Sequence, residues 1–174
     1  MKISGIIKVA DFFTIANLLS GVLSIFFAIN GNLFVAALLL VIAVFFDWVD
    51  GKIARLNKQT ELQKQFGKEL DSLADIVSFG VAPAVCGFAL GLQQWWQIII
   101  LLFFVGAGML RLARFNVTQN EGFYEGVAIT VNGILFPLLF GLNYLFPISA
   151  YYITAMYVAM AVAILSTYKI KKVF

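Results

Sequence analysis

The sequence has no histidine and little charge, and both absences narrow its possible functions. Of 174 residues, 12 are Lys or Arg and 9 are Asp or Glu, so charged residues make up only 12%. Soluble domains carry about 25%. The absence of histidine excludes imidazole metal sites and histidine acid–base catalysis. The single cysteine, Cys86, excludes an intrachain disulfide.

Long apolar segments dominate the chain instead. Hydrophobic residues make up 62% of it, and the mean hydropathy is +0.96. A membrane span needs about 20 apolar residues, so we predict an all-α integral membrane protein with six transmembrane helices in one domain, residues 1–174. Asp11 and Asn17 interrupt the first apolar run, so we expect this span to be retained rather than cleaved as a signal peptide. The predicted spans are residues 12–29, 33–56, 66–90, 95–115, 127–146 and 148–168, after a short amphipathic stretch at 2–10.

Positive charge lies on one side of this predicted arrangement. All 12 Lys and Arg residues fall on or near the side that holds both termini, residues 57–65 and the polar loop 116–126. Residues 57–65 are expected to form a polar loop or a helical extension into water. The opposite turns, residues 30–32, 91–94 and 146–148, carry none. The positive-inside rule therefore predicts that both termini are cytoplasmic and that the protein lies in the cytoplasmic membrane. We find no internal repeat, which weighs against an inverted-repeat transporter.

Four aspartates interrupt the apolar pattern near this cytoplasmic side. Asp47 and Asp50 lie toward the end of the second predicted span, and Asp71 and Asp75 near the start of the third. Spacings of three and four place each pair on one helix face. A carboxylate inside a membrane costs roughly 2.5–3.5 kcal/mol on insertion scales. We therefore predict that the four form an oxygen-rich site for divalent cations, Mg²⁺ or Mn²⁺.

The residues beside the aspartates suit a nucleoside diphosphate. Gly51 and Ala54 are small enough for a flat nucleobase to approach the helix backbone, and the Arg55 fork suits a phosphate. Two metal ions roughly 3.5–4 Å apart can clamp a diphosphate, while a further carboxylate accepts a proton from an attacking hydroxyl. This combination indicates phosphoryl transfer. The alternative is a set of helix-packing small residues and solvated boundary charges.

These residues also form a longer pattern: Asp47-x-x-Asp50-Gly51-x-x-Ala54-Arg55, then Gly67-x-x-x-Asp71-x-x-x-Asp75. The pattern resembles the signature of the CDP-alcohol phosphotransferase family at every fixed position. Residues 71–84, 111–116 and 14–21 further resemble the phosphatidylserine synthase branch of that family. The resemblance implies a homodimer of six-helix subunits that transfers the phosphatidyl group of a CDP-linked lipid to L-serine and releases CMP.

The resemblance implies a role for each group of residues. Two metal ions would be held by Asp47, Asp50, Asp71 and Asp75, with Asp75 also serving as general base. The CDP-lipid would be held by Asn17, Gly51, Ala54, Arg55 and Lys64. The acceptor would be held by Arg111, Arg114 and Asn116. The chemistry of arginine supports the last assignment independently, because its fork suits the serine carboxylate.

The chain departs from the family pattern at three places. Eleven residues separate Arg55 from Gly67, where many members have about eight, and an extra turn of helix or a longer loop would absorb them. Lys64 stands where Ser or Thr is common and would supply charge instead. Residues 126–130 lack the prolines often seen in this branch.

Several alternatives stay open at this point. The nearest alternative function is the same phosphotransfer to another acceptor, glycerol 3-phosphate or an inositol phosphate. The alternative from a different class is a transporter in which the aspartates form an ion or proton relay. Arg111 and Arg114 also fit simple cytoplasmic anchors, and Asn17 fits an interhelical hydrogen bond. Nothing indicates nucleic-acid binding, because the net charge of +3 follows from membrane topology.

Overall fold

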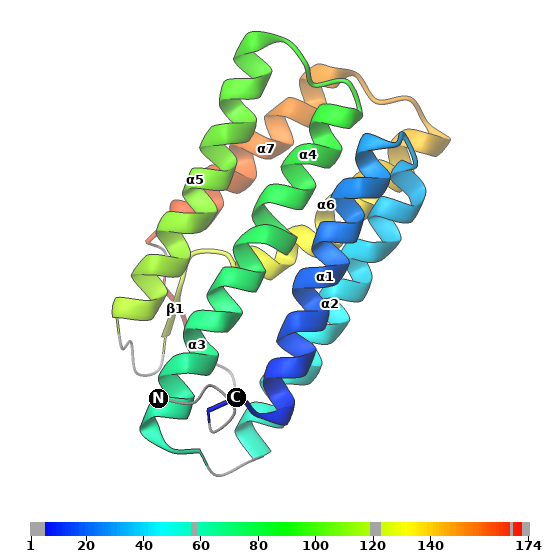
Figure 1. The fold of residues 1–174 in the computed structure, drawn as a ribbon. Helices are drawn as coiled ribbons and strands as arrows, with labels where there is room; N and C mark the ends of the chain where they lie inside the picture. Colours follow the sequence, from blue (N-terminus) through cyan, green and yellow to red (C-terminus); the bar gives the residue numbers. More distant parts are fainter. Residues whose placement is uncertain (1–5, 57–58, 119–122, 168, 172–174) are drawn as a thin grey trace.

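The protein is a bundle of helices that run side by side along one direction (Figure 1). The computed structural model describes residues 6–56, 59–118, 123–167 and 169–171. In chain order the helical elements are α1 (Val9–Ile29), α2 (Leu33–Leu56), α3 (Glu61–Asp75), η2 (Ile76–Val81), α4 (Ala82–Ala89), α5 (Trp95–Val117), η3 (Ile129–Val131), α6 (Asn132–Leu145) and α7 (Ala150–Leu165).

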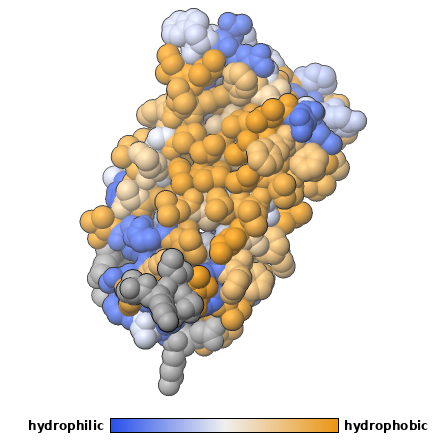
Figure 2. All heavy atoms as spheres, in the orientation of Figure 1, coloured by the Kyte–Doolittle hydropathy of each residue, from blue (hydrophilic) through white to orange (hydrophobic). Residues whose placement is uncertain are grey.

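Four described helices have the length and apolar composition to cross a membrane. They are Val9–Ile29, Leu33–Leu56, the continuous run Glu61–Ala89 and Trp95–Val117. Hydrophobic side chains cover the middle of the face seen in Figure 2, and hydrophilic ones gather toward its two ends. This distribution is the one expected of a membrane protein. Two shorter apolar helices, Ile129–Leu145 and Ala150–Leu165, occupy the positions of the last two predicted spans.

The predicted element boundaries are wrong at the start of two helices. The first helix begins at Val9 rather than residue 12, because the Asp11 carboxylate accepts the backbone N–H of Lys8 at 2.8 Å and caps it. The predicted amphipathic stretch 2–10 therefore overlaps α1, and its residues 2–5 lie outside the described part of the chain.

The third helical run begins at Glu61, five residues before the predicted start at 66. Thr60 is its N-cap: the Thr60 hydroxyl accepts the Gln63 N–H at 3.3 Å, and the Gln63 side chain accepts the Thr60 N–H at 3.2 Å. Because of this capping box, residues 61–65 form the helical extension that was one of the two alternatives for the segment 57–65.

Two three-residue strands add to the predicted helices. β1 (Phe123–Glu125) pairs antiparallel with β2 (Lys169–Lys171), with Tyr124 opposite Ile170. Helix α7 (Ala150–Leu165) ends before β2, and Arg114 donates to the carbonyls of Leu165 and Ser166 at 3.4 and 3.1 Å. The predicted final span, 148–168, is accordingly shorter in the structure.

The third helical run changes its winding at η2, a π-helical segment that starts directly after Asp75. Pro83 follows it and lacks the N–H that would bond the Phe79 carbonyl in an α-helix. Asn132 donates its side-chain amide to that carbonyl at 2.9 Å. The irregular segment therefore keeps its backbone bonded inside the protein, as a membrane interior requires.

An aromatic cluster fills the core around α4. The Tyr157 ring stacks on Phe136 with centroids 4.2 Å apart and meets the edge of Phe104 at 5.2 Å. The Tyr157 hydroxyl donates to the Pro83 carbonyl at 2.6 Å. This cluster joins α5, α6 and α7 to α4, and the end of the bundle formed by α1, α2 and α3 is left for a polar site.

Close packing at Gly133 gives a testable prediction. A Cβ added at Gly133 would collide with the Val44 side chain and lie 2.6 Å from the Phe79 ring. We expect Gly133→Ala to lower the free energy of unfolding by about 1–3 kcal/mol, because overpacking forces neighbours apart. The measurement is thermal unfolding in detergent.

Gly141 in the same helix is the matched control, because a Cβ there would meet nothing within 4 Å. Gly141→Ala should unfold at or slightly above the temperature of the unmodified protein, since alanine favours the helix. Equal unfolding temperatures for the two variants would contradict the packing assignment.

Candidate metal and substrate site

Two helices bring three carboxylates together at one end of the bundle. One carboxylate oxygen from each of Asp47 on α2 and Asp71 and Asp75 on α3 lies within 4.8 Å of the other two. Asp71 and Asp75 share a helix face because they are four residues apart. The grouping that the sequence predicts for these three residues is therefore present.

Asp50 lies outside this group of three. Its carboxylate accepts a hydrogen bond from the Thr14 hydroxyl of α1 at 2.7 Å. It is buried at 6% exposure and still lines the same cavity as Asp47 and Asp71. Its part in metal binding stays a prediction, and Thr14 fixes the direction of the carboxylate.

A cation between the three grouped carboxylates would offset the repulsion among their negative charges. Like charges this close repel one another strongly where water is scarce. Within the described part of the chain, no Lys or Arg nitrogen lies within 4.0 Å of them, and the one salt bridge there, Lys64 to Glu61, is exposed. An all-oxygen donor set with a compensating divalent charge is the arrangement that Mg²⁺ and Mn²⁺ accept. The residues therefore fit a divalent metal site.

Unsatisfied polar atoms surround Asp75, the most deeply placed of the three. Asn17 donates its amide to Asp75 at 3.2 Å, yet its own buried Oδ1 has no hydrogen-bond partner among the described residues. The buried Nε of Arg111 has none there either, and Asp75 is the opposite charge that acts on it. Buried polar groups are nearly always paired, so these atoms indicate room for a polar ligand.

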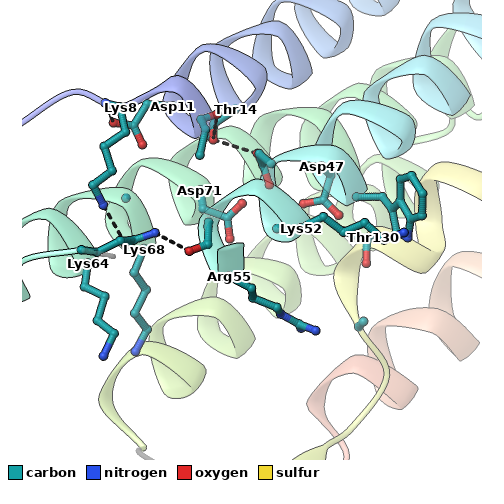
Figure 3. A pocket seen from close by; sticks show the side chains of 18 residues that line it. Lys8, Asp11, Thr14, Asp47, Lys52, Arg55, Lys64, Lys68, Asp71 and Thr130 are labelled. Atoms are coloured by element: carbon teal, nitrogen blue, oxygen red, sulfur yellow. Dashed lines mark hydrogen bonds between the residues drawn. The ribbon is translucent and has the colours of Figure 1, made fainter. Parts of the chain in front are cut away.

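A cavity of about 840 Å³ opens beside the aspartates. Figure 3 shows charged side chains from the start of α1, the end of α2 and the start of α3 converging on it. A Cβ added at Gly51 would meet nothing within 4 Å, so this wall is open for a ligand to approach the backbone. The lining residues include four predicted for the CDP-lipid: Gly51, Ala54, Arg55 and Lys64.

Four predicted ligand-binding residues are absent from the cavity lining: Asn17, Arg111, Arg114 and Asn116. Asn17 contacts Asp75. Arg114 donates to the end of α7. The Asn116 amide donates to Ser72 at 3.0 Å and to Glu69 at 3.4 Å, which joins α5 to α3. Of the three predicted acceptor residues, Arg111 is the one with a buried donor left unpaired among the described residues.

Sequence reasoning missed several residues that line the cavity. Lys8, Asp11 and Thr14 come from the start of α1, and their three-residue spacing ahead of Asn17 was a readable signal. Lys52 lies two residues after Asp50, and Lys68 lies three residues before Asp71. Thr130 comes from η3, and no local pattern indicates that this segment returns to the site.

The family model described as CDP-alcohol phosphatidyltransferase matches residues 7–168. The chain belongs to this family. The match covers all of the described helices and confirms the resemblance drawn from the aspartate signature.

Curated relatives of this CDP-alcohol phosphatidyltransferase chain carry two kinds of name. It is 44% identical over 122 residues to the CDP-diacylglycerol–serine O-phosphatidyltransferase of Saccharomyces cerevisiae, covering 66% of this chain and 43% of that one. It is 35% identical over 164 residues to the archaetidylserine synthase of Methanothermobacter thermautotrophicus, covering 93% and 65%. A serine O-phosphatidyltransferase of Methanocaldococcus jannaschii is 35% identical over 134 residues, covering 77% and 61%. The chain thus spans between 43% and 65% of the length of these relatives.

The carboxylate group predicts how the site responds to neutralisation. We expect Asp71→Asn to weaken Mn²⁺ binding at least roughly tenfold, the equivalent of about 1.4 kcal/mol, because a neutral amide replaces one of three charged ligands. Titration of purified protein followed by electron paramagnetic resonance measures this directly. Glu61→Gln on the exposed start of the same helix is the control and should bind Mn²⁺ normally. Equal affinities for both variants would contradict metal binding by Asp71.

Proposed function

We propose that this protein transfers the phosphatidyl group of a CDP-linked lipid to the hydroxyl of L-serine and releases CMP. One observation carries the proposal: three carboxylates from two helices meet beside a cavity of about 840 Å³ in a chain of the CDP-alcohol phosphatidyltransferase family. The names of the relatives support serine as the acceptor. A diacylglycerol and an archaeol lipid would present the same headgroup to this site.

Each part of the site has a task in this reaction. Asp47, Asp71 and Asp75 would hold the divalent metal, and Asp50, which accepts a hydrogen bond from Thr14, lines the same cavity. Mg²⁺ or Mn²⁺, bound as two ions, would neutralise the diphosphate oxygens and stabilise charge that develops on them. Gly51 and Ala54 leave space for the cytosine base and ribose, and Arg55 and Lys64 bind phosphate oxygens.

Asp75 serves as the general base. It takes the proton of the serine hydroxyl while Asn17 holds its carboxylate in place. The serine oxygen then bonds to the lipid-side phosphorus, and the bond from that phosphorus to the bridging oxygen breaks. CMP leaves with the electron pair of that bond, and the product is a phosphatidylserine-type lipid.

Arg111 is the leading candidate to bind the serine carboxylate. It is buried, its Nε has no partner among the described residues, and its charge interacts with that of Asp75, the proposed base. A guanidinium fork binds a carboxylate through two parallel hydrogen bonds. Arg114 and Asn116 stay candidates, although their side chains already bond to α7 and α3.

The proposal includes the arrangement in the membrane. Residues 1–174 form one domain whose six helices cross the cytoplasmic membrane, with both termini and the active site on the cytoplasmic side. The predicted positive side and the aspartate end of the bundle coincide, which supports this orientation. A homodimer is expected from the family resemblance.

Two rival functions make different demands on the structure. Transfer to glycerol 3-phosphate or an inositol phosphate needs a second dense cationic pocket for the acceptor, and Arg111 is the one acceptor candidate with an unpaired buried donor among the described residues. An ion or proton transporter needs ionisable groups through the depth of the membrane. The carboxylates here gather at one end, which favours the enzyme.

The direct test measures CMP release from a CDP-lipid by purified protein with Mg²⁺ or Mn²⁺. L-Serine, glycerol 3-phosphate and an inositol phosphate are supplied separately, and we expect release with serine alone. Asp75→Asn should lower turnover by roughly 10²–10⁴-fold, because the proton acceptor is lost. Release with a different acceptor would keep the chemistry and overturn serine; normal turnover by Asp75→Asn would overturn the base.

Substitution of Arg111 tests the acceptor site separately. Arg111→Lys keeps the charge but loses the planar fork, so we expect the KM for serine to rise by roughly tenfold. The KM for the CDP-lipid should not change, because that substrate binds beside α2. Steady-state kinetics with each substrate varied in turn measures both values. A serine KM that equals the unmodified value would assign Arg111 to membrane anchoring or packing.

A further inference from the structure

The side chain of Gln59 joins the start of α1 to the end of α2 at the rim of the cavity. The Lys8 ammonium donates to the Gln59 side-chain oxygen at 2.7 Å, and the Gln59 amide nitrogen donates to the Ala54 carbonyl at 2.6 Å. Dashed lines in Figure 3 mark both contacts. Lys8, Ala54 and Gln59 all line the cavity. We call this chain of contacts the rim strap.

The rim strap supplies a hydrogen-bond donor to a backbone carbonyl at the C-terminal end of α2. Ala54 lies in the last turn of α2, which ends at Leu56, and carbonyls in a last turn lose their intrahelical partners. Gln59 supplies a side-chain donor in place of a backbone N–H. Because Ala54 and Arg55 are neighbours, a bond at the Ala54 carbonyl also restricts how Arg55 leaves the helix.

The other end of the rim strap is fixed to α1. The backbone N–H of Lys8 donates to the Asp11 carboxylate at 2.8 Å, and Asp11 is buried at 3% exposure. The Lys8 ammonium finds its partner in the Gln59 oxygen, so that oxygen cannot turn toward Ala54 and the amide keeps one orientation. The end of α2 is thereby connected to a rigid part of the fold rather than to a neighbouring loop alone.

We propose that Gln59 and Lys8 are positioning residues that hold the Ala54–Arg55 wall of the cavity in the geometry that binds the nucleotide. This inference rests on the proposed function, because it takes the cavity as the CMP-binding part of the site. The rim strap acts on the nucleotide and not on the acceptor, since Arg111 lies on α5 beside Asp75. Loss of the strap should therefore weaken CMP and CDP-lipid binding selectively.

The test compares two glutamines that make the same local contact. Gln59→Met removes both hydrogen bonds without a change of charge or length. Gln93 is the matched control: its amide donates to the Phe88 carbonyl, five residues earlier at the end of α4, as Gln59 does to Ala54 at the end of α2. Gln93 is exposed and is absent from the lining of the site cavity, so Gln93→Met reports the cost of losing a helix-end contact alone.

The readouts are the Kd of CMP with Mg²⁺, measured by calorimetry on the full-length protein, and the KM of each substrate. We expect Gln59→Met to raise the CMP Kd and the CDP-lipid KM by roughly three- to tenfold, the usual effect of a lost hydrogen bond. The serine KM should not change. Gln93→Met should match the unmodified protein in all three values.

Lys8 provides a second variant that does not depend on the folding of the first. Lys8→Met should raise the CMP Kd in the same direction, and Lys8→Arg should restore it because arginine still donates to the Gln59 oxygen. If Gln59→Met cannot be purified, this pair decides the question. A Lys8→Arg protein as weak as Lys8→Met would overturn the positioning role.

The outcomes separate the rim strap from the proposed function. A CMP Kd within twofold of the unmodified value for Gln59→Met overturns the strap, as does an equal loss in Gln93→Met. Unmodified protein that binds CMP but releases none from a CDP-lipid with any acceptor overturns the function, while the CMP Kd values still judge the strap. Unmodified protein that binds no CMP overturns both.

Discussion

The gathering of three carboxylates at one end of an apolar bundle is the constraint on which the rest of the structure depends. Oxygens of Asp47, Asp71 and Asp75 lie within 4.8 Å of one another, and all three residues lie on two helical runs that are long and apolar enough to cross a membrane. Their mutual repulsion and partial loss of hydration oppose folding. The group therefore fits a compensating divalent cation, and polar residues nearby hold two of the site's carboxylates, those of Asp50 and Asp75, in place.

Helix α1 performs much of that support. Thr14 of α1 donates a hydrogen bond to Asp50. Asn17, three residues later on the same face of α1, donates one to Asp75. The packing of α1 against α2 and α3 thus fixes the direction of carboxylates that belong to two other helices. Because hydrogen bonds in water-poor surroundings are costly to leave unmade, the position of α1 and the geometry of the acidic group depend on each other.

Much of this site could be predicted from the sequence, because local spacing determines it. The aspartate signature predicts which side chains share a helix face, and Thr60-x-x-Gln63 encodes a helix start that composition alone obscured. The link from Thr14 to Asp50 was not predictable, because it depends on how two helices pack. The same holds for Arg114, whose charge indicates an anion or a membrane surface but whose partners are carbonyls at the end of α7. Spacing defines a helix face, while tertiary packing decides what that face meets.

The π-helical segment after Asp75 has a consequence for which parts of the fold this helix can contact. A π turn holds more residues than an α turn, so the side-chain directions of α4 are rotated relative to those of α3. The helix face that carries Asp71 and Asp75 in α3 therefore does not continue straight into the face that α4 turns toward the core in the run Glu61–Ala89. Side chains and carbonyls of α4 can therefore meet Tyr157 while α3 brings Asp71 and Asp75 to the carboxylate group. The π-helical segment thus lets one continuous helix place its carboxylates in the site with one half and its core residues against α7 with the other.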